Sequence, residues 1–283
     1  MLNALRVIRG LMAFLTAIPV KMDESFLDIS ARYMFLFPII GALIGFIVGI
    51  YARFTGYLLF LLLQTINNVV FSGTYEVFFS LIAKGFASVM TIAFLLLVIG
   101  LQHTDGLVDV GNALGIRKAS LKEKVDIAHE LAVTRIGAFL AVLISTVTFL
   151  IIFLTKTDVI IQAIIVAETI AKLAMVTTGW QGTSPPPSFY ENRWEKGRSF
   201  IDSIKNKHDK YAFSLIISFV VSFVFFGFNA IFIVGSGIIV GCIMIVVGKH
   251  VFGGVNGDIF GATNEIARMI ALFVILVISL CLL

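Results

Sequence analysis

Long apolar runs dominate this sequence and decide what the chain can fold into. A helix needs roughly 17 or more mostly apolar residues to cross a membrane. Charged residues make up only 13% of the chain, against about 25% in an average soluble protein. We therefore predict an all-α fold, a polytopic integral membrane helical bundle of about seven transmembrane helices in one membrane-embedded domain, residues 1–283. The predicted spans are 34–52, 80–101, 136–155, 158–179, 212–228, 230–248 and 267–283.

Two further apolar pieces are not expected to span. Residues 11–20 follow Arg6 and Arg9 but are short and show no small-residue cleavage pattern. They predict an N-terminal interfacial or re-entrant helix that stays in the protein. Residues 57–71 contain Gln64, Asn67 and Asn68, which predicts an interfacial or re-entrant piece.

The basic residues separate by side of the membrane. With seven spans, the polar segments 102–135, 180–211 and 249–266 share one side, which carries 17 of the 21 Lys and Arg residues. Orientation follows this bias, so the segments are predicted to be cytoplasmic in a multi-pass cell-membrane protein. Because no single basic patch forms, the charge favours a lipid membrane as partner and not nucleic acid. A homo-oligomer is left open.

The first chemically rich motif runs over 102–113. If this segment is helical, Asp105, Asp109 and Asn112 lie at i, i+4 and i+7 and share one face. Oxygen ligands of this kind suit Mg²⁺, which also binds substrate phosphates. The alternative is that these are solvated loop residues, and spacing alone leaves both interpretations open.

The second motif runs from Gly253 to Glu265. Glycines 254, 257 and 261 follow the spacing of one helical face, and Asp258 and Glu265 share a face. A glycine-rich turn before a helix can bind an anion through free N–H groups. The alternative is a helix-packing glycine stripe with a polar cap.

Three other charges stand at or inside predicted spans. Arg135 opens one span, where it can anchor the helix at the headgroups or bind a phosphate oxygen. Glu168 and Lys172 are four residues apart within an apolar run and can pair on one helical face. Charges at membrane depth usually face a bundle interior or cavity. Structural pairing and a place in the site's lining are both left open.

Together these motifs resemble the cobalamin synthase family, the adenosylcobinamide-GDP ribazoletransferases. Four elements match in order along nearly the whole chain. The first are Phe37-Pro38-Ile39-Ile40-Gly41 and the His103, Asp105, Gly106, Leu107, Asp109 pattern. The others are Arg135-Ile136-Gly137 and the run from Gly253 to Glu265. The sequence departs from the family pattern at Asn112 and Val133, where aspartates are expected.

The resemblance implies a membrane transferase of late cobalamin biosynthesis. It would join adenosylcobinamide-GDP to α-ribazole or its 5′-phosphate, with release of GMP and with Mg²⁺ as cofactor. His103 is a candidate general base, since an unperturbed imidazole has a pKa of about 6.5, and Glu265 is the second candidate catalytic residue. The implied metal ligands are Asp105, Asp109, Asn112 and Asp258. The implied substrate-binding residues are Arg135, Lys172, Gly253, Gly254, Gly257 and Asn264.

Two alternatives come from other classes. A transporter or ion channel would use intramembrane acids, which suits Glu168 but not an acidic cluster at the cytoplasmic end. A diverged phospho-alcohol transferase would also use spaced aspartates. The CDP-alcohol phosphotransferases, however, expect Asp-Gly-x-x-Ala-Arg, whereas Asp105-Gly106 is followed here by Leu107-Val108-Asp109-Val110, with Asp109 and Val110 in place of Ala and Arg.

The predicted sidedness can be measured by labelling. Cysteines introduced as Lys118→Cys and Lys205→Cys should both react with an impermeant thiol reagent only from the cytoplasmic side, because both lie in segments on the basic-rich side. Labelling of the two positions from opposite sides would contradict the seven-span topology.

Overall fold

The computed structural model describes residues 4–20, 26–116, 120–128, 133–186 and 195–281, which form helices and turns and contain no β-strand. Parts of the predicted segments 102–135 and 180–211 thus lie outside the described residues. The elements are α1 (Ala4–Leu15), α2 (Phe26–Arg32), η1 (Met34–Leu36), α3 (Phe37–Phe71), α4 (Glu76–Ile99), α5 (Gln102–Leu114), α6 (Leu121–Ala128), α7 (Arg135–Leu154), α8 (Ile160–Gln181), α9 (Glu195–Ile204), α10 (His208–Phe226), η3 (Gly227–Asn229), α11 (Ala230–Phe252) and α12 (Gly257–Cys281).

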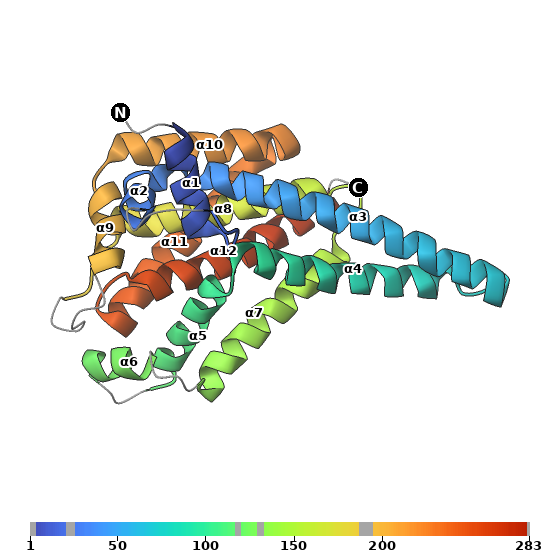
Figure 1. Ribbon diagram of the computed structural model, residues 1–283, viewed down its shortest axis with the longest axis horizontal. Coiled ribbons are helices and arrows are strands. Elements are labelled where there is room, and N and C mark those ends of the chain that lie inside the picture. Colours follow the sequence, from blue (N-terminus) through green and yellow to red (C-terminus); the bar gives the residue numbers. More distant parts are fainter. Residues whose placement is uncertain (1–3, 21–25, 117–119, 129–132, 187–194, 282–283) are drawn as a thin grey trace.

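Helix α8 lies at the centre of the bundle. Every residue from Ala163 to Gly179 is buried, and α3, α10, α11 and α12 pack around the helix (Figure 1). An apolar helix that is buried on all sides belongs to the interior of a larger assembly. Polar groups on α8 therefore face other helices of the same chain and not lipid.

Glycines let α3 approach α8 closely. A Cβ on Gly45 would lie 2.5 Å from the Ile165 Cα, and a Cβ on Gly41 would overlap the Glu168 carbonyl group. Small residues at intervals of four allow helix backbones to come together in membrane proteins. This contact fixes α3 along the part of α8 that carries Glu168.

Six stretches of the described residues are long and apolar enough to cross a membrane, as expected of a multi-pass membrane protein. They are Met34–Phe71, Glu76–Ile99, Arg135–Leu154, Ile160–Gln181, His208–Phe252 and Gly257–Cys281. The fifth contains both α10 and α11, which pack against each other on either side of η3. Seven crossings, as predicted, require that this pair crosses twice.

Residues 57–71 differ from the prediction, because they are the second half of α3 and not a separate interfacial or re-entrant piece. Their polar side chains form hydrogen bonds to α4 and to the turn that precedes it. Gln64 Nε2 donates to Ser80 Oγ at 2.8 Å, and the buried Asn67 Oδ1 accepts from the Tyr75 backbone N–H at 3.0 Å. The polarity that suggested a membrane surface instead joins α3 to α4.

The polar segment predicted at 249–266 is also largely helical. Only residues 253–256 separate α11 from α12, and Asn264 and Glu265 are buried inside the bundle. Helices α5, α6 and α9 lie at the same end of the molecule as the start of α12, and the α3–α4 turn lies at the other end (Figure 1). The chemically rich motifs thus share one end of the bundle.

The N-terminal helix α1 is amphipathic. Val7, Leu11 and Leu15 are buried, whereas Leu5 and Ile8 are exposed. A helix with one apolar face packed on protein and further apolar side chains outside suits an interfacial position. That position remains a prediction.

The α3–α8 contact gives a stability prediction. Gly41→Ala should lower the free energy of unfolding by about 1–3 kcal/mol, because the new methyl group overlaps the α8 backbone. Gly235→Ala is the matched control, since a Cβ there meets nothing within 4 Å. Thermal unfolding in detergent checks both, and equal midpoints for the two variants would contradict the close approach.

Candidate active site

The two sequence motifs meet where α5 crosses α12. A Cβ on Gly106 would lie 2.7 Å from the Asp258 carbonyl oxygen, and one on Gly261 would lie 3.0 Å from the His103 carbonyl oxygen. Such distances mean that the two helix backbones touch at glycine positions. Residues that are far apart in the sequence therefore share one site.

Three carboxylates lie around this crossing. Asp105 is exposed, and Asp109 and Asp258 are half-buried. Asn256 caps α12, because its Oδ1 accepts from the Ile259 backbone N–H at 3.0 Å, and its Nδ2 donates to Asp258 Oδ2 at 2.8 Å. Asn256 thereby orients Asp258 at the first turn of the helix.

The donor set is suited to magnesium. Among the described residues, no three His, Cys, Asp or Glu side chains gather closely enough to hold a metal ion by themselves. Mg²⁺ is commonly bound through one or two carboxylates, with water and substrate phosphates as the other ligands. Asp105, Asp109 and Asp258 are oxygen donors on two touching helices, and one or two of them, completed by substrate phosphate and water, would suit the ion. Magnesium itself remains a prediction.

Asn112, predicted as a metal ligand, joins α5 to α7. Its Oδ1 accepts from the Thr134 backbone N–H at 2.9 Å and from Thr134 Oγ1 at 2.8 Å. Thr134 in turn caps α7. A metal ion on this oxygen would have to replace two hydrogen bonds, so the geometry favours a structural role for Asn112.

A buried network of charges lies inside the bundle behind the crossing, and it joins α8 to α12. The Glu168 carboxylate accepts from Arg268 Nε and from Lys172 Nζ, the latter at 3.4 Å. Lys172 Nζ also donates to Asn264 Oδ1 at 2.6 Å. Arg268 Nη1 donates to Glu265 Oε2 at 2.6 Å. The predicted pairing of Glu168 with Lys172 is confirmed, and the pair belongs to a larger network.

His103 is buried in the first turn of α5, whereas Asp105 is exposed. Burial lowers the pKa of His103 well below its usual value of 6.5, and the charges of Lys172 and Arg268 lower that pKa further. Its imidazole is therefore neutral at neutral pH, and the same surroundings disfavour its protonation. The Nδ1 atom of His103 and the Nη2 atom of Arg268 are buried without a hydrogen-bond partner among the described residues.

The glycine-rich turn mainly connects α11 to α12, and most of its backbone groups bond within the protein. Gly253 ends α11 with φ of 73°, a left-handed conformation that suits glycine. The backbone N–H of Gly254 donates to Gly248, and that of Val255 donates to Thr183. Gly257 is exposed, with open space around its Cα. Phosphate binding at this turn remains a prediction, and Gly257 is the position at which the backbone is accessible.

The other predicted site residues divide into two groups. Lys172, Asn264 and Glu265 are part of the buried network, as described above. Arg135 is exposed at the first residue of α7 and belongs to no described contact of that network. A role for Arg135 in binding phosphate remains a prediction.

Sequence reasoning missed Arg268 and Asn256. Arg268 was counted with the cytoplasmic basic residues, but it is 3% exposed and bound to two carboxylates. Its position three residues after Glu265, inside an apolar run, was a signal for a buried pair. Asn256, two residues before Asp258, carries the pattern of a helix N-cap.

The fold and the site together define a class of protein. This is a multi-pass membrane protein with carboxylates and a buried charge network at one end of a helical bundle. The pattern of the cobalamin-5-phosphate synthase family, CobS, matches residues 7–276. The chain belongs to this family, and it is a membrane transferase of late cobalamin biosynthesis.

Named relatives agree with this assignment. The chain is 27% identical over 283 residues to the adenosylcobinamide-GDP ribazoletransferase of Methanococcoides burtonii, covering 96% of this chain and 92% of that protein. It is 27% identical over 287 residues to the protein of that name from Methanocella arvoryzae, covering 95% of each. A third, from Clostridioides difficile, is 27% identical over 280 residues, covering 94% of this chain and 95% of its own. No solved structure matches significantly.

The buried network gives a second stability prediction. Glu168→Gln should cost about 3–5 kcal/mol of unfolding free energy, because Lys172 and Arg268 lose a shared counter-charge in a buried position. Glu76→Gln is the control, since Glu76 is exposed at the start of α4. Thermal unfolding in one detergent compares them. Equal stability of both variants would show that the Glu168 ion pairs do not stabilise the bundle.

Proposed function

We propose that this chain joins adenosylcobinamide-GDP to α-ribazole or its 5′-phosphate and releases GMP. The family assignment supports the reaction class, and the names of the relatives support the substrates. Cobamide assembly of this kind transfers a corrinoid-linked phosphoryl group from GMP to a ribazole hydroxyl. The bond between phosphorus and GMP breaks as the new phosphorus–oxygen bond forms.

The single observation that carries the proposal is the contact between Gly106 and Asp258. It brings the backbones of α5 and α12 together beside Asp105 and Asp258, which supports a shared site for a pyrophosphate substrate. Phosphoryl transfer depends chiefly on positioning and on neutralising phosphate charge. Carboxylates on two touching helices can serve both needs once a divalent cation is bound.

One or two of the carboxylates of Asp105, Asp109 and Asp258 would hold Mg²⁺ together with substrate phosphate oxygens, and the ion would neutralise charge on the pyrophosphate. Asn256 keeps Asp258 in place through its hydrogen bond to Oδ2. The rigid crossing of α5 and α12 limits how far the carboxylates can move apart. We expect the substrate phosphates to enter from the end of the bundle that bears these residues, predicted to be cytoplasmic.

His103 would accept the proton of the attacking ribazole hydroxyl at Nδ1. Burial and the two nearby cations lower the pKa of His103, so its imidazole starts uncharged and would hold the proton only transiently. Because His103 and Asp105 lie on different sides of α5, proton transfer and phosphate binding would use two faces of one helix. Both Glu265 oxygens already accept hydrogen bonds, so Glu265 is better suited to orient Arg268.

The two alternatives are less well supported. Intramembrane charge would favour a transporter, but Glu168, Lys172 and Arg268 bind one another and so stabilise the bundle. A different phospho-alcohol acceptor would preserve the site and change only the nucleophile. Product analysis separates that alternative from cobamide synthesis.

The test is a reconstituted reaction. Purified protein in lipid nanodiscs should convert adenosylcobinamide-GDP, α-ribazole and Mg²⁺ into a complete cobamide and GMP, and chelation by EDTA should abolish turnover. Asp105→Asn and Asp109→Asn should each lower kcat/KM by about 100-fold or more, because charge stabilisation by a bound cation is worth several kcal/mol. Chromatography of cobamide and GMP measures both products.

Asp126→Asn is the matched control, because Asp126 is an exposed acid on α6, outside the crossing. It should retain near-wild-type turnover. Full activity of Asp105→Asn at low Mg²⁺ would make the acidic face of α5 structural. Formation of GMP without cobamide would point to another acceptor.

A further inference from the structure

A pocket lies at the other end of the bundle from the candidate active site. It has a volume of about 360 Å³ and lies between α3, α4 and the turn that joins α7 to α8. Pockets for small molecules usually range from roughly 300 to 1,000 Å³. Most of its wall is apolar, formed by side chains such as Phe60, Ala83 and Ile160.

Two cations line this apolar pocket, Arg53 from α3 and Lys84 from α4. Arg53 Nη1 donates to the Thr157 carbonyl oxygen at 2.8 Å, and Lys84 Nζ lies 5.8 Å from the centre of the Phe153 ring. A carbonyl group and an aromatic ring orient a cation without cancelling its charge. Among the described residues, neither cation forms an ion pair with a carboxylate.

Hydroxyl groups complete the polar part of the lining. Tyr57 and Ser80 line the pocket from α3 and α4, whereas the Thr155 hydroxyl already donates to the Ile151 carbonyl oxygen. Two uncompensated cations with neighbouring hydroxyl donors are suited to a phosphate group, which offers several acceptor oxygens. The geometry therefore calls for a ligand with an anionic head and an apolar body.

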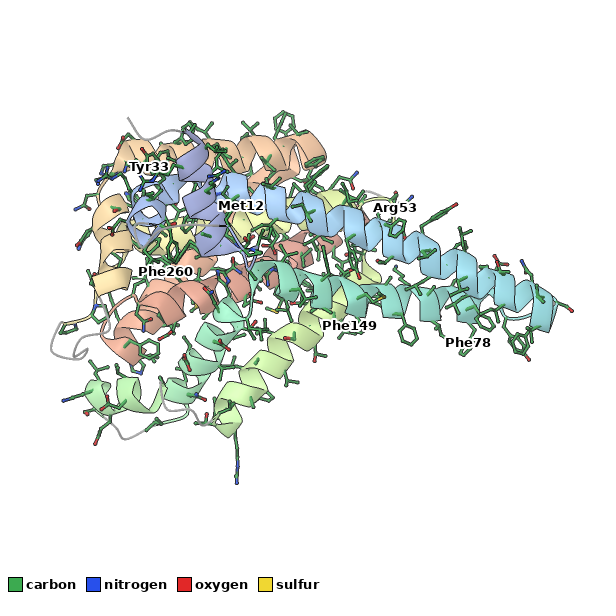
Figure 2. All side chains as sticks on the ribbon, viewed as in Figure 1. Met12, Tyr33, Arg53, Phe78, Phe149 and Phe260 are labelled. Carbon is green, nitrogen blue, oxygen red and sulfur yellow. The ribbon has the colours of Figure 1, made fainter. Side chains whose placement is uncertain are left out.

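The surroundings identify the source of this ligand. Beyond Arg53, α3 continues for 18 residues to Phe71, about 27 Å at 1.5 Å per residue. Figures 1 and 2 show α3 and α4 extending together past the other helices, with Arg53 midway along α3 and Phe78 nearer the tip. Val69 and Val77 on this arm are 78% and 74% exposed. Acyl chains cover such apolar side chains at far lower free energy than water does.

We propose that this pocket binds an anionic phospholipid, with its phosphate between Arg53 and Lys84 and its acyl chains along the exposed faces of α3 and α4. Neither cation is part of the α5–α12 crossing or the buried charge network, so the inference stands apart from the proposed function. A free phosphate would use the cations but leave the apolar walls in contact with water. Lipid uses both parts of the site.

Binding can be measured by native mass spectrometry and by titration of detergent-purified full-length protein. The probes are phosphatidylglycerol and phosphatidylcholine with identical acyl chains. The wild type should prefer phosphatidylglycerol. Arg53→Gln and Lys84→Gln should each weaken its binding about fivefold, and the double variant about 25-fold, since one basic residue near an anionic lipid contributes about this factor.

Lys156→Gln is the matched control, because Lys156 lies in the same α7–α8 turn but does not line the pocket. It should change phosphatidylglycerol binding less than twofold. Arg53→Lys keeps the charge and should keep the preference. If the double variant does not fold, the single Lys84→Gln variant decides the outcome.

Three results would overturn the proposal. The first is equal binding of the two lipids to the wild type. The second is an unchanged preference in the double variant or, if that does not fold, in Lys84→Gln. The third is competition by millimolar inorganic phosphate as effective as that of phosphatidylglycerol, which would assign the pocket to a free anion. Failure of the transferase assay would leave each of these measurements unaffected.

Discussion

The Glu168 carboxylate is the interaction on which the bundle depends. It is fully buried on the central helix and binds two cations, Lys172 on the same helix and Arg268 on α12. Isolated charges in an apolar interior are costly, and removal of one partner leaves the others uncompensated. The network therefore fixes the register of α8 against α12. Because α5 crosses α12 one to two turns away, the same register sets where the carboxylates of the candidate site meet.

Close packing of the helices at glycine residues brings the residues of the candidate site together. Gly106 and Gly261 allow α5 and α12 to touch, and Gly41 and Gly45 hold α3 against α8. In a membrane, helix association relies on such close contact, because lipid supplies little hydrophobic driving force between helices. The acidic residues gain precise positions from glycine contacts that involve no chemistry of their own.

Much of the fold was predictable because its signals are local. Apolar runs predicted the long helices, and the spacing of Glu168 and Lys172 predicted their pairing, since both residues lie on one helix. The Arg268 contact was not predictable in this way, because 100 residues separate it from Glu168. Gln64 and Asn67 suggested a membrane surface because their partners lie beyond the end of α3, Ser80 on α4 and the Tyr75 backbone just before it. The meeting of the two motifs at the crossing could not be predicted from local spacing, because the motifs are far apart in the sequence. The bond of Asn112 to Thr134 spans 22 residues and was equally hidden from local spacing.

The order of synthesis gives the Glu168–Lys172 pair a further consequence. A ribosome makes α8 well before α12, so Arg268 is not yet present when α8 forms. Glu168 and Lys172 neutralise each other within one turn of a single helix, and the nascent helix therefore carries no net charge at its middle. When α12 arrives, Arg268 can join a pair that is already formed. Before α12 is made, the cost of placing Glu168 in lipid is thus lowered by Lys172, a counter-ion on the same helix.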